Sequence, residues 1–357
     1  MSDASETNEY VYISYPHDNS TLLSQMEGLL KEKGYGVKYD IGTGVGKKRS
    51  EHLKSMIDGS KACVCLLTES YAKAPSCMRE LNAILDHLLD KRIVFVYAGD
   101  KESILSTFSL GMRALLEGMK GIEVRDEQGL RDNVAALGEM IEDGNIERLI
   151  VRFGSYNQWK KERKKSFFER WASATDEEEW EKSPIEWIVL DKENDGTLLL
   201  ISRYALDRQQ YNVEGKPITW EGCSLRKWLN NEFLTNAFSR EEQDAIVVSH
   251  LAAERNPRFL EVDPGEDTDD KVFLLSLREA AMYFPSDEAR QCIPTPYALA
   301  NGAYVDDDQK TCWWWLRSPG RKSNCVADVY VDGVLHFFGH WVLGSDGAVR
   351  PSLRIHP

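Results

Sequence analysis

The sequence predicts two domains, an α/β domain on a parallel sheet followed by an α+β domain. In the first part of the chain, short β-rich runs alternate with amphipathic helical segments, and the apolar run ACVCLL (62–67) is typical of a strand buried on both faces. Near residue 142 this alternation stops, and short strands with hairpin signals follow. With 357 residues, the chain is long enough for two cores.

The first domain is expected to contain five strands, each followed by a helix. We expect strands at 10–14, 36–40, 62–67, 93–98 and 121–124, and helices at 19–35, 50–60, 76–90, 103–119 and 128–142. This order predicts a parallel sheet that helices cover on both faces. Ligands of such sheets bind beyond the carboxyl ends of the strands.

The second domain is expected to be a mixture of short strands and helices. We expect a hairpin of strands 185–191 and 197–202, a helix at 224–238, and further strands at 272–276 and 313–318. The pair Asp332-Gly333 between two β-rich runs predicts a tight turn. The domain limits follow: a disordered N-terminus (1–8), the first domain (9–142), a linker (143–147) and the second domain (148–357). A charged insertion (159–182) is expected to form a solvated helical excursion.

Composition excludes several classes of function. The net charge of −14 disfavours binding to nucleic acid or to an anionic membrane. No apolar run approaches the roughly 20 residues of a membrane span, and the polar start does not resemble a signal peptide. Seven scattered cysteines fit a reducing compartment, so we expect a cytoplasmic protein.

No metal site is expected from the spacing of histidines and cysteines. The sequence has neither a His-Glu-x-x-His nor a Cys-x-x-Cys pattern. His336 and His340 are four residues apart, but their surroundings are strand-like, so the spacing does not make a helical ligand pair. We expect both to face solvent or a turn.

Glu80 is the candidate for a functional carboxylate. If Ser76 is the N-cap of the helix, the capping-box position falls on Arg79 rather than Glu80. The positions three and four residues away from Glu80 hold no basic partner. On a helical wheel Glu80 lies about 40° from Ile84, at the edge of the apolar stripe. A favourable position in the dipole at the helix start remains an alternative reading.

Three segments, in order, resemble the Toll/interleukin-1 receptor (TIR) domain in its bacterial form. They are YVYISYPHDNS (10–20), YDIGTGVGKK (39–48) and CLLTESYAKAPSCMREL (65–81). Within them, the family motifs match at Tyr12, Ile13, Ser14, Tyr15, Asp18, Ser70, Tyr71, Cys77, Glu80 and Leu81. Ser76 stands where the family has a tryptophan. The resemblance covers residues 8 to about 142 and implies a flavodoxin-like sheet of five parallel strands.

The resemblance also implies an activity. In TIR domains that cleave NAD⁺, the glutamate of the last motif is catalytic, and here it is Glu80. The implied NAD⁺-binding residues are Tyr15, Asp40, Lys47, Ser70, Tyr71 and Cys77. NAD⁺ would be a substrate for a hydrolase or a cyclase in bacterial signalling or defence, with no tightly bound cofactor, and TIR domains would self-associate. The alternative is a non-catalytic TIR adaptor that only recruits partners.

The second domain resembles an uncharacterised bacterial domain with a C-type-lectin-like or formylglycine-generating-enzyme-like fold. The segments PIEWIVLD, TWEGCSLRKWLNNEFL, WWWLRSPG and VRPSLRI carry this resemblance. It implies a sensing or display surface for an unknown protein or small molecule, of a kind that reverse-transcriptase systems diversify in some cases. Because Trp313, Trp314 and Trp315 alternate along a strand, we expect at least one to face outward. The implied ligand-binding residues are Trp314, Arg321, Tyr330, His336, Phe338, His340 and Trp341.

Overall fold

The computed structural model describes residues 10–16, 20–40, 47–142, 149–160 and 180–357. The chain divides into two compact units, one of residues 1–151 with 192–197 and 357, the other of residues 152–191 and 198–356. The expected disorder at 1–8 and the linker at 143–147 lie outside the described residues. Among the described residues, no helix combines the length and the apolar character that crossing a membrane requires.

The first unit is a sheet of five parallel strands in the order β2-β1-β3-β4-β5. Its strands are β1 (Tyr10–Ser14), β2 (Gly36–Lys38), β3 (Ala62–Leu67), β4 (Arg92–Ala98) and β5 (Gly121–Val124). Its helices are α1 (Ser20–Glu32), α2 (Lys47–Asp58), α3 (Pro75–Leu85), α4 (Lys101–Leu105), α5 (Leu110–Gly118) and α6 (Glu127–Glu142). The predicted parallel α/β architecture is confirmed.

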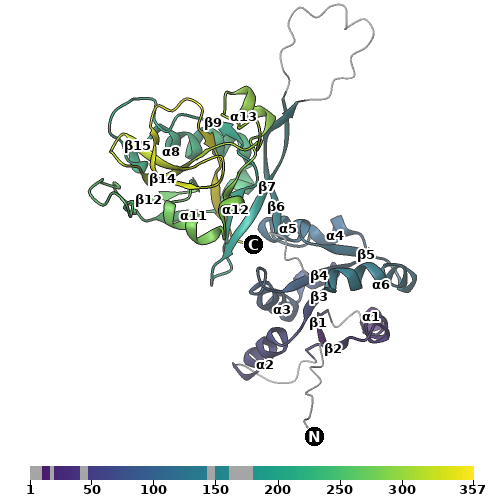
Figure 1. The fold of residues 1–357 in the computed structure, drawn as a ribbon. Helices are drawn as coiled ribbons and strands as arrows, with labels where there is room; N and C mark the ends of the chain where they lie inside the picture. Colours follow the sequence, from purple (N-terminus) through teal and green to yellow (C-terminus); the bar gives the residue numbers. More distant parts are fainter. Residues whose placement is uncertain (1–9, 17–19, 41–46, 143–148, 161–179) are drawn as a thin grey trace, which may run out of the picture. The chain divides into compact units, whose positions relative to one another are not determined.

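Helices cover both faces of this sheet. On one face, α1 and α6 pack on apolar side chains of the strands, and the buried core there includes Met26, Val64 and Leu137. Helices α2 and α3 lie on the opposite face (Figure 1). The helix expected at 103–119 is two helices, because the Ser109 hydroxyl accepts a hydrogen bond from the Met112 N–H and begins α5 as a new helix.

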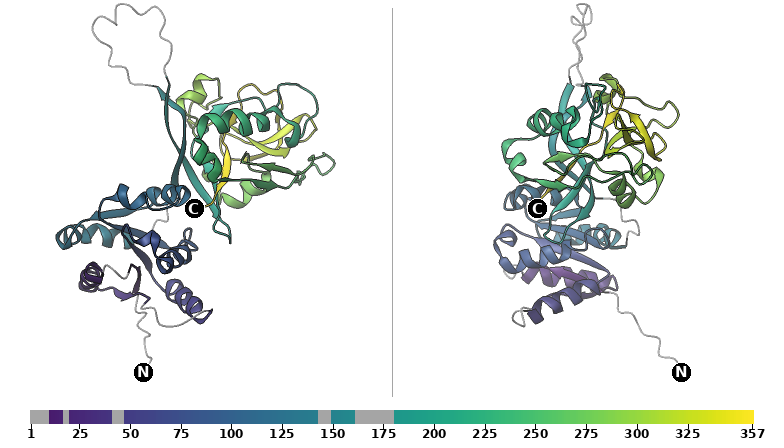
Figure 2. Two further views of the ribbon diagram at one scale, coloured as in Figure 1. Left: turned by 180° about the vertical axis from the view of Figure 1, so that it is seen from behind. Right: turned by 90° about the vertical axis from the view of Figure 1, so that its left-hand side faces the viewer.

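The second unit is mostly β-sheet, with short helices around the strands (Figure 2). Its strands are β6 (Ile150–Lys160), β7 (Trp180–Lys192), β8 (Leu198–Ser202), β9 (Asp207–Arg208), β10 (Ile246–Val247), β11 (Ser249–Leu251), β12 (Thr268–Asp270), β13 (Val272–Phe273), β14 (Trp314–Pro319), β15 (Cys325–Val329), β16 (Leu335–Trp341), β17 (Ala348–Val349) and β18 (Ser352–Ile355). Its helices are α8 (Ser224–Trp228), α9 (Leu234–Ala237), α10 (Arg240–Ala245), α11 (Leu277–Tyr283), α12 (Asp287–Arg290) and α13 (Pro296–Ala300).

Two larger sheets organise these strands. One has the order β10-β18-β8-β7-β6, with β13 also paired to β18, and the other has the order β16-β15-β14-β17-β9. The expected hairpin is confirmed as β7 and β8, and the helix expected at 224–238 is α8 and α9 joined by a π-helical turn (Leu229–Phe233). The helical excursion expected at 159–182 is wrong at both ends, which lie in β6 and β7; residues 161–179 are outside the described part.

The predicted tight turn joins β15 to β16. The Tyr330 N–H donates to the Val334 carbonyl, and the Gly333 N–H donates to the Tyr330 carbonyl. Gly333 has φ = +85°, and a Cβ at this position would lie 1.7 Å from the Asp287 carbonyl oxygen. Both the backbone conformation and the close approach therefore require glycine here.

We predict that Gly333→Ala lowers the free energy of unfolding of the second unit by roughly 2–4 kcal/mol, because the new methyl group collides with backbone. Every tryptophan of the chain lies at residue 159 or later, so tryptophan fluorescence during urea unfolding follows this unit. Val334→Ala, which trims an exposed side chain in the same turn, is the control and should change stability by less than about 0.5 kcal/mol. Equal effects of the two variants would contradict the steric explanation.

Candidate functional site

Helix α3 carries Glu80 on its buried face. The helix begins one residue earlier than expected, with Ala74 as N-cap and Pro75 in the first turn, so the assumed Ser76 N-cap is wrong. The third helical position is then Cys77, and Glu80 still takes no part in a capping box. Glu80 is only 7 % exposed and shares the buried face with Leu81 and Ile84. The predicted place at the edge of the apolar stripe is confirmed, with deeper burial than an edge implies.

The Glu80 carboxylate lies near Tyr12, in the middle of β1, and near Tyr15, which follows the strand. Burial raises the pKa of the Tyr12 hydroxyl well above its usual value, and the charges of Glu80 and Asp40 and a side-chain interaction with Glu80 raise it further. The pKa of Tyr15 is raised by burial, by Tyr39 and then by the same two carboxylates. Asp40 follows β2 and is 6 % exposed. Glu80 and Asp40 are therefore close enough to Tyr15 to affect its pKa, and the role of the three residues in binding NAD⁺ stays a prediction.

Tyr12 belongs to this group although the sequence analysis used it only as part of a motif. Its side chain is fully buried, and its hydroxyl makes no hydrogen bond of regular geometry within the described part of the chain. Buried hydroxyls nearly always have such a partner, and exceptions are found at functional sites. Strand alternation could have identified Tyr12, because residues two apart in a strand share a face and Tyr12 is two residues before Ser14 in β1.

Tyr71 and Cys77 support the site from within the core. Tyr71 is fully buried, and its hydroxyl lies 2.6 Å from the Ser14 Oγ. Its pKa is raised by burial, by Cys65 and by Glu80. Cys77 is 1 % exposed, and its Sγ–H donates to the Tyr15 carbonyl at 3.5 Å, which ties α3 to the end of β1.

The remaining predicted residues of this site stand further out or are not described. Ser70 is half-buried, and its Oγ lies 2.8 Å from the Thr68 Oγ1. Lys47 begins α2, but its side chain is outside the described part of the chain, and Asp18 lies outside the described residues altogether. Tyr39, which was not predicted, packs edge-on against Tyr15 with ring centroids 5.6 Å apart.

We predict that the hydroxyls of Tyr71 and Tyr12 differ in their contribution to stability. Tyr71→Phe should destabilise the first unit by about 1–2 kcal/mol, because the buried Ser14 hydroxyl loses its partner. Tyr12→Phe removes a hydroxyl that interacts with Glu80 but makes no hydrogen bond of regular geometry within the described residues, so the loss should be smaller than for Tyr71→Phe. The first unit has no tryptophan, so its transition is the loss of far-UV circular dichroism without a change in tryptophan fluorescence. The reverse order of losses would contradict the hydrogen-bond assignment.

In the second unit, the three consecutive tryptophans are all buried. Trp313 is 3 % exposed, and Trp314 and Trp315 are fully buried. Strand β14 lies inside its sheet, between β15 and β17, and both of its faces are covered. The expectation of an outward-facing tryptophan is therefore wrong. Trp314 packs against Phe284 and donates from its indole nitrogen to the Arg290 carbonyl.

The other predicted ligand-binding residues gather around β16, the edge strand of this sheet. Tyr330, Phe338 and Trp341 are 44 %, 48 % and 52 % exposed, respectively. Arg321 is exposed, and its backbone N–H donates to the Phe338 carbonyl. This strand thus presents aromatic side chains to solvent, as the display interpretation requires.

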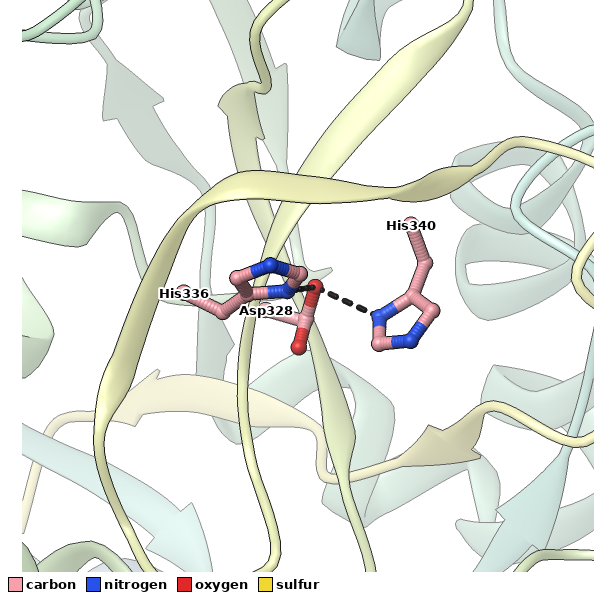
Figure 3. Close-up of side chains that lie close together, drawn as sticks. All are labelled: Asp328, His336 and His340. Carbon is pink, nitrogen blue, oxygen red and sulfur yellow. Dashed lines mark hydrogen bonds and ion pairs between the residues drawn. The ribbon is translucent and has the colours of Figure 1, made fainter.

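His336 and His340 are half-buried on β16 rather than in a turn or on open surface. Both point their Nδ1 atoms at one oxygen of Asp328, the Oδ2, at 3.0 and 2.8 Å (Figure 3). Burial acts to lower the pKa of His340, but the hydrogen bond and charge of Asp328 outweigh it and hold the pKa above its usual value. The two histidines do not lie in a turn, and their side chains face solvent only in part, at 33 % and 34 % exposure. The sequence analysis did not identify Asp328. Pairing residues outward from the Asp332-Gly333 turn places Asp328 opposite His336 and could have found it.

Comparisons with known proteins agree with this division of the chain. The model of the TIR domain family matches residues 11–137. A model of a domain of unknown function, DUF6273, matches residues 195–357. No curated protein matches the chain. One similar solved structure is that of the TIR domains of the activated Roq1 resistosome directly recognizing the pathogen effector XopQ. It is 21 % identical, the match covers 38 % of this chain and 80 % of that one, and the TM-score is 0.24.

The five-stranded parallel sheet makes the first unit a flavodoxin-like α/β domain. A buried carboxylate lies beside the end of its first strand. Residues 11–137 are, more particularly, a TIR domain, and residues 195–357 form a DUF6273 domain.

Proposed function

We propose that the TIR domain cleaves the bond between nicotinamide and ribose in NAD⁺, as a hydrolase or a cyclase in bacterial signalling or defence. Glu80 is the catalytic carboxylate in this proposal, and Tyr12, Tyr15 and Asp40 surround it. The observation that carries the proposal is the burial of Glu80 beside the carboxyl end of β1, where it interacts with the buried Tyr12 hydroxyl and raises its pKa. Ligands of parallel sheets bind at this end of the strands.

The reaction requires of the protein mainly a negative charge that is held close to the ribose. When the C1′–N bond breaks, its electron pair leaves with nicotinamide, and positive charge develops on the ribose ring, as in glycoside cleavage. A carboxylate that is 7 % exposed acts through a low-dielectric surrounding, where its attraction for this charge is stronger than in water. Water at C1′ then gives ADP-ribose and releases a proton, whereas attack by a group of the same molecule gives a cyclic product.

A non-catalytic adaptor is the second candidate, and the same burial favours it. A carboxylate that is almost covered offers little surface to a ribose. In this case Glu80 would only fix α3 against β1, and the TIR domain would recruit other TIR domains. Both candidate functions include self-association of TIR domains.

The second unit would supply control through ligand binding, with a C-type-lectin-like fold. The support for this role is the exposed aromatic surface of Tyr330, Phe338 and Trp341, because monomeric proteins rarely expose such residues together without a partner. A protein or small-molecule ligand bound there would favour assembly of the TIR domains. Diversification by a reverse transcriptase would be concentrated in residues 321–341 in this proposal.

Glu80→Gln is predicted to reduce nicotinamide release from NAD⁺ by about 100-fold or more, because it removes the charge that stabilises the transition state and keeps the shape. Release is followed by liquid chromatography on the full-length chain. Glu69→Gln changes an exposed glutamate ahead of Tyr71 and should leave the rate unchanged. Full activity of Glu80→Gln would overturn the assignment of Glu80.

The adaptor candidate predicts a different result. The wild-type chain would then release no nicotinamide, even at high protein concentration or when it is clustered on a multivalent scaffold. Release that appears only on clustering supports an active site that assembly completes. No release under any of these conditions would overturn the proposed activity.

A further inference from the structure

The hairpin of β15 and β16 brings three side chains with metal-ligating atoms to one point. Asp328 lies on β15, and His336 is its direct partner on β16. The register then shifts, so that Val326 pairs with His340 instead of Phe338. Gly339 makes the shift possible, because it has φ = +72° and a Cβ there would lie 2.2 Å from the Val326 carbonyl oxygen. The bulge therefore aims two histidines, rather than one, at Asp328.

Asp328 is fully buried, and hydrogen bonds within the described residues reach one of its two carboxylate oxygens. Its Oδ2 accepts from both imidazoles, but its Oδ1 has no hydrogen-bond partner within the described residues. In the same part of the chain, its ion pairs are with His336 and His340 alone. A buried carboxylate in this state is costly unless a cation or further donors compensate it.

Aromatic rings hold His340 in place. Trp313 stacks on its imidazole, with ring centroids 4.2 Å apart and an interplanar angle of 20°. Tyr330 lies nearly parallel to it, with centroids 6.3 Å apart and an angle of 7°. The side chains of both histidines remain about one-third exposed, at 33 % and 34 %. The group is thus fixed by packing and open on one side.

We propose that Asp328, His336 and His340 form a binding site for a divalent transition-metal cation of the Zn²⁺ type. Two imidazole nitrogens and a carboxylate oxygen are the ligand set of sites that keep a coordination position open for water or another ligand. The three ligand atoms lie within 4.8 Å of one another. Metal–ligand bonds of about 2.0–2.2 Å would bring neighbouring ligand atoms to about 3.0–3.5 Å, so only a small closure of the rings is needed.

The competing explanation is a proton in place of the metal. One protonated imidazole would balance the charge of Asp328, but it would leave the Oδ1 without a partner among the described residues. A metal cation can contact both oxygens of one carboxylate and would satisfy this atom as well. The exposed aromatic residues Tyr330 and Phe338 border the histidines, with His336 contacting both. A bound metal would thus present its open position to a ligand on the predicted display surface.

The test is a titration of the full-length chain, without a polyhistidine tag and stripped of metal by chelation, with Co²⁺ and Zn²⁺. We expect one equivalent of Co²⁺ to produce visible ligand-field absorption, which Zn²⁺ displaces. His336→Gln and His340→Gln should each weaken binding by more than the roughly 10- to 100-fold that loss of an outer-shell partner causes. Asp328→Asn should have the same effect while it keeps the size of the buried side chain.

His250→Gln is the matched control. His250 also contacts carboxylates, of Asp269 and Asp267, but all three side chains are exposed. This variant should bind metal as the wild type does. If Asp328→Asn fails to fold, the two histidine variants carry the test, because their rings are partly exposed and near-ultraviolet circular dichroism of the tryptophans confirms their fold.

The thermal unfolding of the second unit gives a second measurement. Zn²⁺ should raise its midpoint in the wild type and in His250→Gln, but not in His336→Gln, since a ligand stabilises only the state that binds it. Wild-type binding no tighter than that of a His336→Gln/His340→Gln double variant would overturn the site and leave the shared proton as the explanation. Equal loss of binding in His250→Gln would overturn it too.

Discussion

A carboxylate removed from water must be compensated close by, and this constraint shapes both halves of the chain. In the TIR domain, Glu80 is 7 % exposed on a helix face that is otherwise apolar. The charge of Glu80 raises the pKa of the buried hydroxyls of Tyr12 and Tyr71. The hydrogen bond from the Cys77 Sγ–H to the Tyr15 carbonyl connects α3 to the end of β1 beside these groups.

The second unit meets the same constraint with different partners. Asp328 is fully buried, and its Oδ2 accepts hydrogen bonds from two imidazoles on a bulged strand. Here the compensation reaches the surface, because the histidines are partly exposed beside aromatic residues. The two buried carboxylates therefore lead to different proposals: a substrate with developing positive charge in the first unit, and a metal cation in the second.

Local sequence patterns predicted most elements of the first unit. Strands β3 and β5 have the predicted ends, since one is a continuous apolar run and the other a short β-rich run between helices. The helical wheel placed Glu80 correctly because the position of a side chain around a helix depends only on spacing. The break between α4 and α5 was missed, because it depends on Ser109 acting as a cap within an apolar stretch.

Tertiary context decided what could not be predicted in the second unit. Alternation shows that successive tryptophans face opposite sides of β14, but it does not show that both sides are covered. The turn at Asp332-Gly333 was predictable and sets Asp328 opposite His336. The bulge at Gly339, which brings His340 to the same carboxylate, depends on a close approach to Val326 that has no local signal.

A structure of the chain with a non-hydrolysable carbocyclic NAD⁺ analogue tests the role of Glu80 most directly. We predict that a hydroxyl of the ring that replaces the nicotinamide ribose lies about 2.6–3.2 Å from the Glu80 carboxylate, within hydrogen-bond reach. An analogue bound with this ring away from Glu80 and outside such reach would contradict the proposed active site.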